Sequence, residues 1–167
     1  MYYSINDFVQ EWSHEAASTQ RLLDVLTDES LSQEVTSVDR TLGRIAWHIV
    51  ISLHTMGSEA GLTFDAPSHN SVIPATAKEI AFSYRQASDA MIEAVKTQWT
   101  DEKLKELQTI YGQEWTNGLF LSVLMHHQTH HRGQMSVLMR QAGLSVPGVY
   151  GPAREEWSTM GMEAPYI

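Results

Sequence analysis

The sequence predicts an all-α protein: a four-helix bundle with long connecting loops and an irregular C-terminal tail. Four segments of the 167 residues carry apolar residues at the spacing of a helix that buries one side. Two of these segments are strongly apolar, and no repeat, low-complexity stretch or linker divides the chain. A chain of this length can form one hydrophobic core of sufficient size but is too short for two. We therefore expect a single bundle domain over residues 1–167.

The first helix is expected from about Ile5 to Leu26. Phe8 and Trp12 begin its apolar stripe, which three leucines continue towards the C-terminal end. Its middle, His14–Thr19, is mostly polar. A polar middle is unusual for a bundle helix and indicates a face turned towards a cavity.

The second helix follows Thr41 and is expected to continue to about Gly57. Its stretch AWHIVIS is apolar on nearly every side, as is typical of a buried helix. Gly57 and Gly61 are suitable residues for its end.

The third helix is expected from about Ala77 to Thr97, after a loop over Thr63–Pro74 that contains two prolines. Thr76 and Glu79 fit a capping box, in which a hydroxyl is followed by a carboxylate three residues later. The connections before and after the second helix span about fourteen and nearly twenty residues, long for tight turns. Crossover connections, or loops that close over one end of the bundle, are therefore expected.

A short extended segment or hairpin is expected within Leu104–Trp115, around Tyr111-Gly112, where apolar and polar residues roughly alternate. Thr116 or Asn117 can cap the fourth helix. That helix is expected from Gly118 to about Ala142.

Composition excludes several classes of protein. The formal charge of -9, without a basic cluster, argues against nucleic-acid binding. The absence of cysteine excludes disulfides, a thiolate nucleophile and sulfur ligands for a metal. The N-terminus does not resemble a secretory signal, and no run approaches the roughly 20 apolar residues that span a bilayer. We expect a cytoplasmic protein that binds neither nucleic acid nor membrane.

Four of the eight histidines lie in one segment, MHHQTHHRGQMSVLMR. On a helix, His127 and His131 lie one above the other, and His126 and His130 form a second pair about 100° away. Apolar residues on both sides continue the line of His127 and His131, so this pair is expected to face inward. Two imidazoles at this spacing can bind one metal ion. Since Gln128 follows His127 where a zincin peptidase has glutamate, that class of enzyme is not supported.

A third ligand should come from another helix. His48 is the main candidate because it lies in the most apolar stretch of the chain, where an imidazole without a partner would be costly. His14, His54 and His69 are weaker candidates. The alternative for each of these residues is an ordinary histidine, hydrogen-bonded in the core or solvated at the surface.

Two neighbours of the histidine pair have two interpretations each, and a third has one. Arg132 and Gln134 either belong to the polar face of the helix or support the ligands by hydrogen bonds. Gly133 in mid-helix costs about 1 kcal/mol relative to alanine, which indicates close approach by another element.

The segment HQTHHRGQ (His127–Gln134) resembles the H-x-x-x-H-R-G-Q signature of the DinB-like (DinB/YfiT) metalloenzyme family. The resemblance implies that His127 and His131, with His48 from the second helix, bind one divalent metal ion. The tail PGVYGPAREEW (Pro147–Trp157) is also similar to the C-terminal segment of some members. The family further implies a four-helix bundle with the metal at one end of a pocket, and frequently a homodimer. His126 and His130 depart from the pattern, because they offer an alternative register for the metal.

The function implied is metal-dependent chemistry on a small molecule. Zinc or nickel would be the first choice of ion, with iron or manganese as alternatives. A three-histidine ion with open positions can activate water or hold a low-molecular-weight thiol as thiolate, as in an S-transferase. The lack of a carboxylate at signature spacing favours the thiol over hydrolysis. The alternative function is a non-enzymatic, stress-associated dimeric bundle that binds metal. A metal site sealed by Trp12, Trp47, Tyr150 or Trp157 would favour this alternative.

Overall fold

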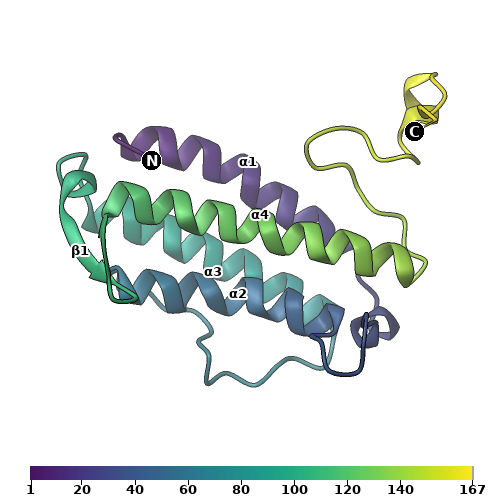
Figure 1. The fold of residues 1–167 in the computed structure, drawn as a ribbon, viewed down its shortest axis with the longest axis horizontal. Helices are drawn as coiled ribbons and strands as arrows, with labels where there is room; N and C mark the ends of the chain where they lie inside the picture. The colour runs from purple at the N-terminus through teal and green to yellow at the C-terminus, as the bar shows by residue number, and fades with distance from the viewer. Residues whose placement is uncertain (167) are drawn as a thin grey trace.

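The computed structural model describes residues 1–166 and confirms the all-α prediction (Figure 1). The four long helices are α1 (Ile5–Asp24), α2 (Leu42–Glu59), α3 (Ala77–Gln98) and α4 (Asn117–Gln141). Short 3-10 helices are η1 (Glu29–Ser32), η2 (Lys103–Lys105) and η3 (Trp157–Met160). A small hairpin of β1 (Leu107–Ile110) and β2 (Gln113–Thr116) lies between η2 and α4.

The N-terminus of each long helix is fixed by a hydroxyl side chain that accepts a backbone hydrogen bond: Ser4, Thr41, Thr76 and Thr116. Half of the predicted capping box is present: Thr76 accepts from the Glu79 N–H at 3.2 Å, but the Glu79 carboxylate accepts from the Thr76 hydroxyl, at 2.8 Å, in place of its backbone N–H. Helix α1 ends two residues before the predicted Leu26. The chain turns there because Thr27 and Ser30 exchange hydrogen bonds.

The helices pack in the cyclic order α1, α3, α2, α4, so α1 and α2, although consecutive in sequence, lie diagonally opposite. Figure 1 shows α1 and α4 running in one direction and α2 and α3 in the other. The segment 60–76 therefore has to return along the whole bundle before α3 begins, which confirms the expected crossover connection.

The hairpin confirms the prediction made for Leu104–Trp115. Its strands pair antiparallel from Leu107 opposite Thr116 to Ile110 opposite Gln113. Tyr111 and Gly112 form a two-residue turn in which both φ angles are positive, 52° and 74°. Such turns match the twist of the flanking strands.

Two features of the sequence, the polar middle of α1 and Gly133, have surroundings that differ from those predicted. The polar side chains in the middle of α1 do not line a cavity: Glu15, Ser18 and Thr19 are buried, and Glu15 and Thr19 contact Arg132 of α4. The cavity beside this part of α1, of about 310 Å³, is lined instead by small neighbours such as Ala16 and Ala17. Gly133 is not a point of close approach either, since a Cβ at this position would meet no atom within 4 Å.

The C-terminal tail is irregular, as predicted, apart from η3. Figure 1 shows it turning back beside α1 before it ends away from the four helices. Within residues 1–166, none of the helices combines the length and the apolar character needed to cross a membrane.

Candidate metal centre

Three histidine rings meet between α2 and α4. His48 projects from α2, and His127 and His131 lie one turn apart on the neighbouring α4. The Nε2 atom of His127 is 3.1 Å from that of His48 and 3.2 Å from that of His131. One nitrogen from each ring lies within 4.8 Å of the others, so the group could hold a metal ion.

The spacing and chemistry of these nitrogens fit a divalent ion. Two imidazole nitrogens bound to one zinc-sized ion lie about 3.0–3.4 Å apart, given metal–nitrogen bonds of about 2.0–2.1 Å. Both measured separations fall within this range. Three nitrogen ligands from the protein also leave coordination positions free, as in catalytic rather than closed structural sites.

The rings are electrically neutral at pH 7, as metal ligands must be. Burial, with a smaller contribution from repulsion by neighbouring histidines and Arg40, lowers the pKa of both His48 and His127 to about 4. Burial also lowers the pKa of His131. The lone pairs of neutral rings are therefore available to a cation.

Gln134 sets the tautomer of His131. Its Oε1 lies 2.7 Å from Nδ1 of His131. Because an amide oxygen only accepts, Nδ1 must carry the proton, which leaves the Nε2 lone pair facing the other two rings. The contact agrees with the supporting role that the sequence suggested for Gln134.

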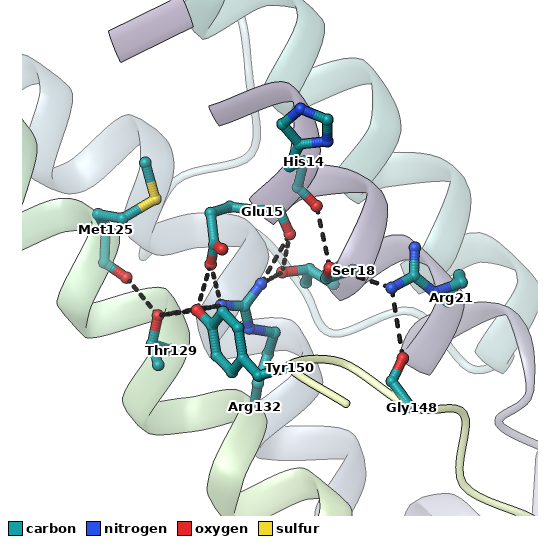
Figure 2. A network of polar contacts seen from close by, with 10 residues as sticks. His14, Glu15, Ser18, Arg21, Met125, Thr129, Arg132, Gly148 and Tyr150 are labelled. Carbon is teal, nitrogen blue, oxygen red and sulfur yellow. Dashed lines mark hydrogen bonds and ion pairs between the residues drawn. The ribbon is translucent and has the colours of Figure 1, made fainter. Parts of the chain in front are cut away.

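Arg132 does not support the ligands directly, and that expectation is wrong. Its side chain is only 2% exposed and forms an ion pair with the carboxylate of Glu15 on α1 (Figure 2). It also donates to the Glu15 carbonyl at 2.7 Å, the Tyr150 hydroxyl at 2.8 Å and the Thr129 hydroxyl at 2.9 Å. The Tyr150 hydroxyl in turn donates to Glu15 at 2.7 Å. Arg132 therefore joins α4 to both α1 and the C-terminal tail.

No other histidine among the described residues belongs to the converging group, although the ring centroid of His130 is 4.9 Å from that of His131. His126 and His130 are exposed, so the alternative register is disfavoured. His14 is exposed on α1, and the ring of His54 packs against Phe64. His69 lies in the crossover loop and lines two of the cavities beside His48.

Cavities open beside the three rings, and the four expected aromatic residues do not seal them. A cavity of about 360 Å³ is lined by His48 and His127 together with Tyr111 and Trp115 of the hairpin. Of the four, only Trp47 lines a cavity that touches a ring of the group. Trp12 donates to Ser88 in the core, and Tyr150 contacts Arg132. Sequence reasoning missed Tyr111 and Trp115, because a predicted hairpin carries no signal of the helix face on which it lies.

Comparisons with known proteins agree with this fold. The sequence profile of the DinB family matches residues 1–164. An uncharacterized protein of Bacillus subtilis strain 168, YrdA, is 54% identical over 165 residues, which is 99% of each chain. A solved structure of a DinB-like protein from Bacillus cereus ATCC 10987 is 50% identical and superposes with a TM-score of 0.86 over 90% of this chain and 100% of that one.

A more distant structure shows that the fold persists at low identity. The DinB-like protein YjoA of Bacillus subtilis is 16% identical, with a TM-score of 0.68 over 86% of this chain and 96% of its own. The profile match, the YrdA likeness and the helix arrangement lead to one conclusion. The chain belongs to the DinB family.

Proposed function

We propose that the protein is a metal-dependent enzyme that activates a low-molecular-weight thiol or a water molecule at His48, His127 and His131. The observation that carries the proposal is the convergence of three neutral imidazole nitrogens beside open cavities. A divalent ion held there would stabilise a bound thiol as thiolate or make a bound water more acidic. The protein has no cysteine, so it cannot supply a thiolate of its own.

The protein's own residues have distinct roles in this proposal. His48, His127 and His131 would hold the ion, and Gln134 keeps the proton of His131 on Nδ1. The cavity lined by Tyr111 and Trp115 would take the apolar part of a substrate and exclude water from it.

Two observations bear on the choice between thiol and water. Asp39 is the one carboxylate among the described residues that line the cavities touching the three rings. Its Oδ2 accepts a hydrogen bond from the Thr36 hydroxyl at 2.7 Å, within its own loop. A general base must reach the water that it deprotonates, so this engagement favours the thiol route.

Metal binding is the first test. In a calorimetric titration with zinc or nickel, the metal-free protein should bind one ion per chain. His127→Ala should abolish this binding, whereas His126→Ala, an exposed histidine on the same helix, should leave it unchanged. Equal loss in both variants, or no binding by the wild type, would reject the proposed ligands.

Activity is the second test. The metal-loaded protein should accelerate the reaction of a small thiol with a chromogenic electrophile, and removal of the ion should stop it. Hydrolysis of an activated ester without any thiol effect would assign the water route instead.

A further inference from the structure

Two cavities of different chemical character lie side by side next to His48. The first, of about 250 Å³, is lined by Arg40, Arg44 and Trp47. The second, of about 360 Å³, lies towards the hairpin. Both are also lined by His48, Ile51 and His69, so the two cavities adjoin along this side of α2.

Arg40, Arg44 and Trp47 bring hydrogen-bond donors to the first cavity. Arg40 and Arg44 are exposed, and neither forms an ion pair within residues 1–166. Trp47 is only 5% exposed, and its indole N–H is buried without a hydrogen-bond acceptor. An indole N–H can only donate and a guanidinium carries only donors, so this cavity is suited to a group rich in acceptors.

The charge distribution of the chain strengthens this interpretation. The protein has nine more acidic than basic residues, and four of its other arginines each contact a carboxylate: Arg85, Arg132, Arg140 and Arg154. The two at the cavity do not. The charge of Arg40 also reaches the metal centre, because it contributes to the lowered pKa of His48, His127 and His131.

The second cavity is predominantly apolar. Tyr111 and Trp115 from the hairpin and Val123 from α4 form part of its wall. Two polar atoms in its lining residues are buried without a hydrogen-bond partner: the Thr55 hydroxyl and Nδ1 of His127. An apolar wall with a few unsatisfied polar atoms is typical of a site that binds and orients a small molecule.

We propose that the substrate of this protein is a small molecule with an anionic head group and an apolar body. Arg40, Arg44 and Trp47 bind the head group, and the cavity lined by Tyr111 and Trp115 holds the body. This arrangement places the bond between the two parts at His48. The inference rests on the proposed function only for the reaction at that bond, because the binding is assigned to Arg40, Arg44, Trp47, Tyr111 and Trp115 and needs no metal ion.

The test measures binding without metal, so that it is independent of the metal proposal. Calorimetry with the metal-free protein would compare 3-phenylpropionate, benzylphosphonate and the neutral 3-phenylpropanamide. We expect at least one anion to bind, and the amide to bind at least about tenfold more weakly than that anion, the scale set by a hydrogen bond to a charged group. The better of the two anions identifies the head group as carboxylate or phosphonate.

Charge-matched variants locate the binding. Arg40→Gln should weaken binding of the preferred anion about tenfold or more. Arg154→Gln, which removes the same charge from the exposed tail, should bind like the wild type. Trp115→Ala should weaken the anion and the amide alike, since it removes contacts with the shared phenyl group. Unchanged melting temperatures would establish that each variant is folded.

Four outcomes would overturn the proposal. These are no binding of either anion, equal affinity for anion and amide, unchanged affinity in Arg40→Gln, and binding that occurs only after metal is added. The last would mean that the anion binds the ion itself. If the wild-type protein binds the anion but no metal ion, the proposed function is rejected and this inference stands.

Discussion

Arg132→Met should strongly destabilise the protein, because it removes one partner of a buried ion pair. The side chains of Arg132 and Glu15 are 2% and 11% exposed. In the variant the Glu15 carboxylate keeps only the hydroxyl of Tyr150 as a hydrogen-bond donor. Breaking such a pair from one side costs about 3–5 kcal/mol. With a urea dependence of about 2 kcal/mol per molar, the unfolding midpoint should fall by roughly 1.5–2.5 M.

Two further variants separate the ion pair from simple loss of packing. Tyr150→Phe removes one hydroxyl and leaves the pair in place, so it should cost about 1 kcal/mol or less. The double variant Glu15→Leu, Arg132→Met removes both charges and should recover much of the stability lost in Arg132→Met. Urea unfolding at pH 7, monitored by far-ultraviolet circular dichroism, would measure these three variants and the single variant Glu15→Leu.

The reasoning would be refuted by either of two results. One is a cost below about 1 kcal/mol for Arg132→Met, the value expected of an exposed pair. The other is a double variant whose loss equals the sum of the two single losses, because an interacting pair must be non-additive.

Three other predictions follow from the site and from the sequence. The metal-free protein should lose thermal stability as pH falls from about 6.5 to about 4. The pKa of His48 and of His127 is about 4 in the folded protein and 6.5 in the unfolded chain, so the unfolded chain binds more protons in this range. His48→Gln should flatten the dependence of melting temperature on pH. Light scattering should give a homodimer, twice 18.8 kDa, at micromolar concentration, and a monomeric mass would contradict it. Chelation should abolish any thiol-transfer or hydrolytic activity, and adding the same ion should restore it. Ser122→Ala and Ser136→Ala should remain active, because both hydroxyls donate to backbone carbonyls within α4. A covalent adduct on either serine would disprove the prediction that the attacking group is external.

The helices and the three converging histidines could be predicted because their signals are local. Apolar spacing and hydroxyl caps such as Thr76 act within one or two turns. His127 and His131 are four residues apart, so the helix alone places them together. His48 could be identified because a polar ring in an apolar helix needs a partner. That His48 meets His127, 79 residues away, is not a local matter, and it is implied by the resemblance to the DinB-like signature.

The features that could not be predicted depend on residues far apart in the chain. Glu15 and Arg132 are separated by 117 residues, and neither carries a local sign of the other. The polar stretch of α1 therefore indicates a cavity when considered alone, whereas in the structure its Glu15 forms an ion pair with Arg132. The position of Tyr111 and Trp115 beside the metal centre likewise depends on how the hairpin packs against the bundle, which alternation within a strand does not determine.

Helix α4 is held on two sides by buried polar side chains, and this determines where its histidines point. The amide of Gln128 donates to the Ile49 carbonyl and to the Ser52 hydroxyl of α2, each at 3.2 Å. Arg132, one turn later, holds α1 through Glu15. Both side chains are almost fully buried, at 1% and 2% exposure, so a rotation of α4 about its axis would leave buried donors without acceptors. Apolar contacts alone would tolerate such a rotation more easily, because they are not directional. The two polar contacts therefore fix the rotation of α4, and with it the convergence of His127 and His131 on His48.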